Sequence, residues 1–123
     1  MAKPLTTLVI YQAIGFWSRF CGWHRFAHPE ALLYFSSCKA VHGIGLTQPL
    51  WVLFVDKKGV PLGQWRCLKP NRWLWCAKAA GAIECQAPIE KRRQYLAAFT
   101  HLAWQAQIRP WRLRCFGRRR CGK

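Results

Sequence analysis

The chain has 123 residues, of which 52% are hydrophobic, and this size and composition fit a single domain with one core. Its 20 lysines and arginines face only four acidic residues, which gives a formal net charge of +16 and favours an anionic partner. No stretch reaches the ~18 apolar residues that a membrane-spanning helix needs. We therefore expect no transmembrane span.

The basic residues concentrate towards the end of the chain. Ten of them, and no acid, follow residue 90, whereas residues 1–90 hold ten basic residues and all four acids. Such asymmetry indicates a basic extension on a folded body, with nucleic acid or an anionic membrane surface as the partner. A tail that is merely solvated is the alternative.

Seven cysteines make an odd number, so a complete disulfide framework is not predicted. The apolar run over residues 5–10 is followed by Gln12 and by no small-residue cleavage site, which argues against a signal peptide. We therefore expect reduced thiols and a cytoplasmic protein. Eight tryptophans in so short a chain favour a partner or lipid surface, because indoles are enriched where apolar surface meets water.

The first predicted elements are a helix and a strand. Residues 8–20 are predicted to form a short helix, because Phe16, Trp17 and Phe20 share one face at helical spacing. After a break at His28-Pro29-Glu30, residues 31–35 (ALLYF) form a continuous apolar run of strand length that two serines end. We expect this run to be the first core strand.

A hairpin is the clearest local prediction. Residues 50–55 (LWVLFV) are rich in aromatic and β-branched side chains, and residues 56–59 (DKKG) supply an Asp to start a turn and a Gly for positive φ. Residues 60–68 are then expected to return as the partner strand, with Pro61 marking an edge or an irregular start.

Later segments alternate between strand and helix patterns. Residues 73–77 and 79–85 are predicted to be two short, partly buried strands. Pro88 and Glu90 suit the first turn of a helix, and apolar residues then recur at helical spacing until Pro110, where the helix is expected to end. The remainder, rich in arginine and glycine, is expected to be mobile.

One long segment resembles a known family. Residues 38–60 read CKAVHGIGLTQPLWVLFVDKKGV, and they are similar to the central motif of the domain of unknown function 192 family. Residues 15–22 (GFWSRFCG), 68–70 (LKP) and 81–84 (GAIE) resemble flanking stretches of that family, so the resemblance covers about residues 15–85. It implies a small, strongly curved or barrel-like β-sheet with a little helix, found in bacteria and archaea, and no established reaction.

The chain departs from the family pattern at polar positions. Gly43, Leu46 and Trp51 stand where the family has Thr, Met and Asp, and a basic segment replaces the closing glycine-rich stretch. We predict an α+β fold, with a curved or barrel-like sheet, a short N-terminal helix and a C-terminal basic amphipathic helix. A β-rich domain is expected over residues 1–87, and a basic helix with a mobile tail over residues 88–123.

Cys38, His42 and Asp56 form a candidate pocket within the motif. A Cys beside a His could serve nucleophilic chemistry, because the base raises the thiolate fraction. In an extended segment, however, side chains four residues apart lie about 13 Å from one another. A hydrogen-bonded structural histidine is therefore the favoured interpretation, and no catalytic residue is assigned.

A metal site is considered at Cys21, His24 and His28, which would share one face of a helix. No fourth ligand is evident, and the other cysteines fit no zinc spacing. The sequence therefore predicts neither a metal nor a cofactor.

Arginines and aromatic residues are interleaved near the end of the chain, a pattern that suits phosphate contacts with base stacking or adsorption to an anionic bilayer. The residues expected to bind the anionic partner are Arg109, Arg112, Arg114, Arg118, Arg119 and Arg120. We predict a non-enzymatic binding or accessory protein, with nucleic acid favoured over a membrane surface. A ligand-binding or enzymatic pocket around His42 and Asp56 is the alternative.

Overall fold

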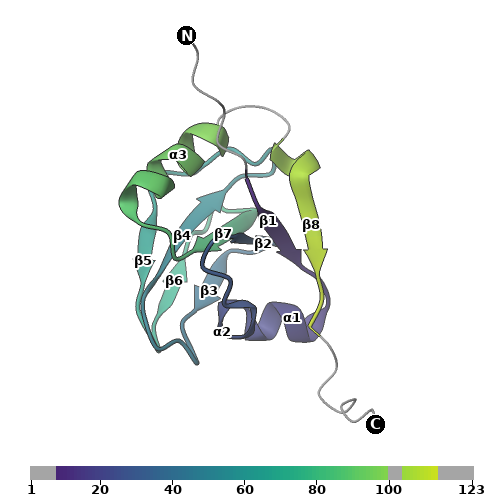
Figure 1. Cartoon of the computed structure of the whole chain (residues 1–123), viewed down its shortest axis with the longest axis vertical. Helices are drawn as coiled ribbons and strands as arrows, with labels where there is room; N and C mark the ends of the chain where they lie inside the picture. Colours follow the sequence, from purple (N-terminus) through teal and green to yellow (C-terminus); the bar gives the residue numbers. More distant parts are fainter. Residues whose placement is uncertain (1–7, 100–103, 114–123) are drawn as a thin grey trace.

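The computed structural model describes residues 8–99 and 104–113 (Figure 1). The elements follow one another as β1 (Ile10–Ala13), α1 (Phe16–Cys21), α2 (Trp23–Phe26), β2 (Leu32–Ser36), β3 (Ala40–His42), β4 (Leu50–Val55), β5 (Arg66–Leu68), β6 (Trp73–Trp75), β7 (Gly81–Cys85), α3 (Ile89–Phe99), the 3-10 helix η1 (Trp104–Gln107) and β8 (Ile108–Trp111). Within these two described segments, no helix is both long and apolar enough to cross a membrane.

Six of the strands form one mixed sheet in the order β5-β4-β7-β2-β1-β8, and β3 pairs with β6 in a separate two-stranded sheet. The pairs β5–β4, β4–β7 and β7–β2 are antiparallel, whereas β1 runs parallel to both β2 and β8. The α+β class is therefore confirmed. The prediction of a barrel-like sheet is wrong, because β5 and β8 end the sheet at opposite edges and do not pair with each other.

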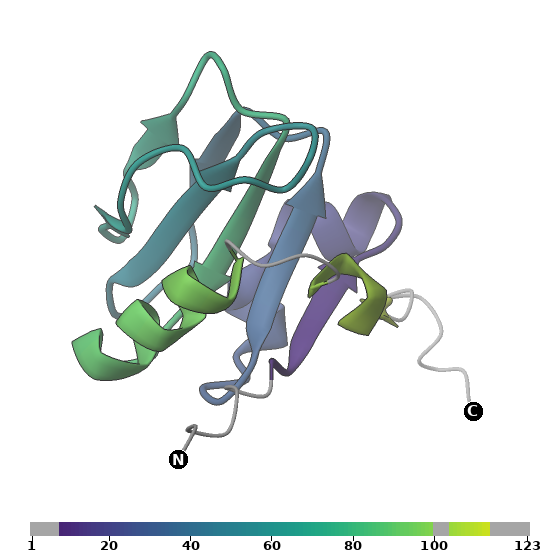
Figure 2. The same ribbon diagram turned by 90° about the horizontal axis from the view of Figure 1, so that it is seen from above.

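The central sheet is covered on both faces, and each face has its own cluster of buried side chains. In β4, Leu53 and Val55 join one cluster, while Val52 and Phe54 join the other, as the alternation of a strand requires. The first cluster lies under α3 and η1 and includes Phe99. The second lies under α2 and the β3–β6 pair, so α3 and η1 cover one face of the sheet and α2 with the β3–β6 pair covers the other (Figures 1 and 2).

The chain start differs from its prediction. Residues 10–13 form β1 instead of the first turns of a helix, because this strand pairs on one side with β2 and on the other with β8. Gly15 then adopts a φ of +87°, which favours glycine, and the helix begins only at Phe16. The local helical spacing of the aromatic residues predicted α1 but carried no information about the two strands that flank β1.

The hairpin after β4 forms, although its return strand is shorter than expected. Asp56 accepts hydrogen bonds at Oδ1 from the backbone N–H groups of Lys58 and Val60, at 2.8 and 2.9 Å, and Gly59 closes the turn at a φ of +83°. The return contacts β4 first through an isolated bridge at Pro61 and pairs regularly only along β5. The strand predicted over residues 50–55 is β4 with the same bounds.

The segment beyond Pro88 contains a shorter helix than predicted, followed by a strand. Helix α3 ends at Phe99, and residues 108–111 form β8, so a helix that reaches Pro110 is wrong. Pro110 lies in an edge strand, where a missing N–H costs little. The buried side of α3 includes Arg92, whose guanidinium lies 3.8 Å from the centre of the Trp51 ring. The predicted basic amphipathic helix is therefore not confirmed.

The C-terminal segment is joined to the rest of the fold. Trp104 is 3% exposed and packs edge-to-face on Tyr34 and Phe99, with ring centres 5.6 and 5.1 Å apart. β8 adds a sixth strand to the main sheet through β1. Residues 104–113 thus belong to the same packed unit as the strands before residue 87, while residues 114–123 of the predicted tail lie outside the described residues.

Candidate functional site

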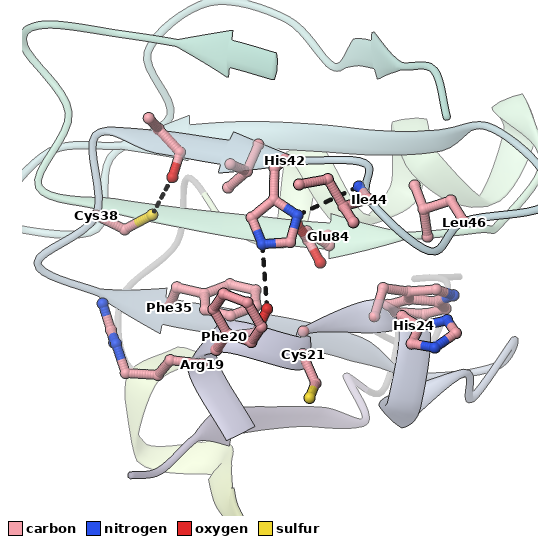
Figure 3. Close-up of a pocket in the computed structure, with 14 residues that line it drawn as sticks. Arg19, Phe20, Cys21, His24, Phe35, Cys38, His42, Ile44, Leu46 and Glu84 are labelled. Carbon is pink, nitrogen blue, oxygen red and sulfur yellow. Dashed lines mark hydrogen bonds between the residues drawn. The ribbon is translucent and has the colours of Figure 1, made fainter. Parts of the chain in front are cut away.

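A cavity of about 310 Å³ is lined by residues of the helices α1 and α2 and of the strands β2, β3 and β7 (Figure 3). Its walls are apolar and aromatic, with a few polar groups among them. The residues that line it are Arg19, Phe20, Cys21, Gly22, Trp23, His24, Phe35, Cys38, Ala40, Val41, His42, Ile44, Leu46 and Glu84.

His42 lines this cavity with both ring nitrogens already hydrogen-bonded to the backbone (Figure 3). The N–H of Ile44 can only donate, so Nδ1, at 3.2 Å, accepts. The carbonyl oxygen of Phe20 can only accept, so Nε2, at 3.1 Å, carries the proton. The ring is thus held as one neutral tautomer that ties β3 to the end of α1, which is a structural role.

Cys38 also lines the cavity, but its thiol is not activated. Its Sγ donates to the carbonyl oxygen of Ala40 at 3.1 Å, and no hydrogen bond between the Cys38 thiol and the ring of His42 is present in the described segments. Burial, the largest cause, raises the pKa of the Cys38 thiol. A nucleophilic cysteine needs the opposite shift.

The third residue of the predicted pocket lies elsewhere. Asp56 stands at the end of β4, where its carboxylate caps the hairpin turn, and it does not line the cavity. The structure therefore brings Cys38 and His42 to one cavity and leaves Asp56 out of it.

Glu84 and Trp23 were not among the predicted site residues, yet both line the cavity. Glu84 is 3% exposed and Trp23 is 4% exposed. Over the described parts of the chain, Oε1 of Glu84 and Nε1 of Trp23 find no hydrogen-bond partner. Burial raises the pKa of the Glu84 carboxyl to about 8, although a hydrogen bond from the Trp23 backbone N–H favours its charged form.

The three residues considered for a metal site, Cys21, His24 and His28, do not line one cavity. Cys21 and His24 line the cavity, whereas His28 stacks on Phe26 with ring centres 5.9 Å apart. In the segments that the structure describes, no group of three potential ligands could hold a metal ion. The five cysteines in those segments are free thiols, and burial raises the pKa of Cys85 to about 11.

A second candidate site is an exposed aromatic row on the outside of the two-stranded sheet. Trp73 and Trp75 are 62% and 66% exposed, while Leu74 between them packs into the core. The ring of His42 lies 5.3 Å from that of Trp73 and 5.9 Å from that of Phe20, which is itself exposed. We call Phe20, His42, Trp73 and Trp75 the aromatic row.

Basic side chains border the aromatic row. Arg66 donates from Nη1 to the carbonyl oxygen of Trp75 at 3.0 Å, so its guanidinium lies beside β6. The Lys39 amine donates to the carbonyl oxygens of Ala77 and Ala79, at 2.8 and 3.0 Å, just beyond the same strand. Arg72 is exposed and immediately precedes β6.

Of the six predicted arginines, only two fall within the described residues. Arg109 is exposed on the edge strand β8, and Arg112 is exposed just after it, with a guanidinium nitrogen close to Gly15. The other four, Arg114, Arg118, Arg119 and Arg120, lie outside the described residues. The aromatic row was not predicted, although the spacing of Trp73 and Trp75 in a short strand could have indicated that both indoles lie on one face.

Comparisons of the chain with protein-family models, with curated proteins and with solved structures find no match. The resemblance to the domain of unknown function 192 family therefore stays a prediction.

Proposed function

We propose that this protein is a non-enzymatic binding protein and that its aromatic row binds single-stranded nucleic acid. The observation that carries the proposal is the pair of exposed indoles, Trp73 and Trp75, on one face of β6 in a chain of net charge +16. Exposed aromatic rings among cations are the usual platform on which unpaired bases stack.

The spacing of the indoles favours a single strand over a duplex. Side chains two residues apart on a strand are separated by about 7 Å, so each indole offers its own stacking surface to one base. In a duplex the faces of the bases are already stacked on their neighbours. Trp73 and Trp75 are therefore suited to bases that are splayed apart.

The electrostatics favour a polyanion. Arg66, Lys39 and Arg72 lie beside the aromatic row and can contact phosphates. Of the four acids, Glu84 is buried with a pKa of about 8 and is therefore mostly neutral at pH 7, which adds to the positive charge. The tail arginines predicted from the sequence would supply further phosphate contacts.

The enzymatic alternative has less support. Both ring nitrogens of His42 are bound by the backbone, Asp56 caps a turn, and the thiol of Cys38 has a raised pKa. None of the three is free to act as a base or nucleophile in this arrangement.

The test is a fluorescence anisotropy titration of a labelled single-stranded oligonucleotide of about 12 nucleotides, a length within the range of known single-strand sites. Because each stacked base contributes about 1–3 kcal/mol, the double variant Trp73→Ala, Trp75→Ala should bind at least roughly thirtyfold more weakly. Affinity should also fall steeply as salt rises, since phosphate contacts release counterions.

The matched control is the double variant Val60→Ala, Ile89→Ala, which removes two other exposed apolar side chains, 49% and 48% exposed. It should bind like the unmodified protein. Equal binding by the two double variants would contradict the proposal. So would tight binding to phosphatidylglycerol vesicles without binding to the oligonucleotide, because the indoles would then serve a membrane surface.

A further inference from the structure

We infer that the cavity receives one base of the single strand that the aromatic row binds. This inference rests on the proposed function and extends it, because it assigns a third base-binding position next to the two exposed indoles. Three features support it: the residues that the row and the cavity share, the opening of the cavity to the surface, and the chemistry of its walls.

The aromatic row and the cavity meet along β3. This strand pairs with β6, so that His42 lies opposite Trp73 and Ala40 lies opposite Trp75. Both Ala40 and His42 also line the cavity, and neither indole does. Because neighbouring strands lie about 4.8 Å apart, a nucleotide that follows the bases on β6 reaches the cavity after crossing a single strand.

His42 is a fixed boundary between the indoles and the cavity. The centre of its ring lies 5.3 Å from that of Trp73 and 5.9 Å from that of Phe20, which also lines the cavity. Both ring nitrogens are bound by the backbone, so the ring cannot turn without the loss of two hydrogen bonds. The boundary is therefore in place before a ligand binds, which lowers the ordering cost of binding.

The cavity reaches the surface. Two of the residues that line it, Phe20 and Ile44, are 55% and 53% exposed, and Ala40 is exposed as well (Figure 3). Phe35 and Val41, which line it too, are buried. The cavity thus opens among residues that belong to the aromatic row or adjoin it and ends among buried ones, as a pocket for one splayed-out base requires.

The walls suit an aromatic base. Phe20 and Phe35 offer ring surface, while Val41 and Leu46 offer aliphatic surface, and single-stranded bases are held by such side chains. Arg19 adds a positive charge, with its guanidinium 6.0 Å from the centre of the Phe35 ring. The volume of about 310 Å³ is at the small end of the range for ligand sites, so it suits one base and not a longer piece of the strand.

The experiment compares two thymidine trinucleotides, one complete and one that lacks a terminal base but keeps its sugar and phosphate. Two bases suffice for Trp73 and Trp75, so the missing base reports on a third position. Binding to the full chain is followed by NMR at millimolar probe concentrations. The complete trinucleotide should bind at least roughly fivefold more tightly, which is the smallest gain expected from one stacked base.

Two variants fill the cavity. Leu46→Phe adds a ring to its wall, and Cys38→Leu replaces a thiol with a larger apolar side chain. Each should remove the advantage of the complete trinucleotide and leave binding of the incomplete one unchanged. The control, Leu62→Phe, makes the same change at a half-buried leucine that packs against the same core cluster as Leu46 but does not line the cavity, and it should keep the full advantage.

Three results would overturn the inference: no saturable binding of the complete trinucleotide, a preference of no more than about twofold, which two placements on the same indoles would give, or a full preference in the folded cavity variants. If one variant does not fold, the other decides. The proposed function fails on a different result, namely equal binding of the 12-nucleotide probe by the Trp73→Ala, Trp75→Ala and Val60→Ala, Ile89→Ala variants.

Discussion

His42 shows how two backbone groups can fix the state of one side chain. Its ring nitrogens join the carbonyl oxygen of Phe20 at the end of α1 to the N–H of Ile44 after β3. The sequence alone allowed either a pocket role or a structural role for His42. The contacts support the structural role, because neither nitrogen is left to bind a substrate.

We expect His42→Ala to lower the free energy of unfolding by roughly 1–2 kcal/mol, because two hydrogen bonds, to the carbonyl oxygen of Phe20 and from the N–H of Ile44, are lost and are only partly replaced by water. Urea denaturation measures this change. The control is His28→Ala, which removes an exposed ring that stacks on Phe26 and should cost at most about 0.5 kcal/mol. Equal losses in the two variants would show that the bridge contributes nothing.

Glu84 gives the fold a specific pH dependence. Its pKa rises from 4.5 to about 8 on burial, so between these values the folded state holds a proton that the unfolded state has lost. The free energy of unfolding is therefore highest below pH 4.5 as far as Glu84 is concerned, and it falls by up to about 1.4 kcal/mol per pH unit towards pH 8.

Glu84→Gln should remove this fall, which denaturation curves at several pH values between 5 and 8 can measure. The cavity also contains Arg19, Cys21, His24, Cys38 and His42. The raised pKa of Cys38 starts from 9.0, so its titration lies above this window. A flat pH profile for the unmodified protein, or the same slope in the variant, would show that Glu84 is not buried as described.

At the scale of elements, the strands made of continuous apolar runs were predictable from the sequence. The strands that form through pairing with residues far away in the chain were not. Residues 50–55 and 31–35 consist of side chains that must be buried on both faces of a covered sheet, so β4 and β2 could be located within one residue. β1 and β8 are only four residues long, and Pro110 lies within β8. β1 pairs with β2 on one side and with β8 on the other, and the β1–β8 pairing joins residues about 100 positions apart, which no local pattern encodes.

The residues of the candidate site were also predictable only in part. The sequence indicated Cys38 and His42 because a thiol and an imidazole stand four residues apart. It did not indicate Trp23 or Glu84, whose burial depends on how α2 packs over β7. A single acid within the apolar run of β7 was nevertheless a local signal, because an ionisable side chain in a strand buried on both faces needs a special environment.

The packing of Trp104 tests whether the C-terminal segment belongs to the core. Its indole is buried against Tyr34 and Phe99, and its Nε1 donates to the carbonyl oxygen of Gly59 at 3.3 Å. Trp104→Ala should therefore cost roughly 3–5 kcal/mol in urea denaturation. Trp75→Ala, which removes an exposed indole, should cost far less, and similar small losses in both variants would mean that the segment is not part of the core.

At the scale of the whole molecule, the fold separates two uses of tryptophan. Trp104 and Trp23 are buried and help to build the two clusters that flank the sheet, whereas Trp73 and Trp75 are displayed on the outer side of β6. Arg66, Lys39 and Arg72 lie near the displayed pair. Composition alone predicted an anionic partner, and the proposed function assigns that partner to the exposed indoles of β6.

The most direct test of this account is an NMR titration of the protein with a single-stranded oligonucleotide, observed through the indole N–H signals. Trp73 and Trp75 should shift most, because bases stack on their exposed rings. Trp65 and Trp104, whose indole N–H groups are bound to the carbonyl oxygens of Arg92 and Gly59, should stay in place as internal controls. Binding that leaves Trp73 and Trp75 unshifted would contradict the central claim that β6 presents the nucleic-acid surface.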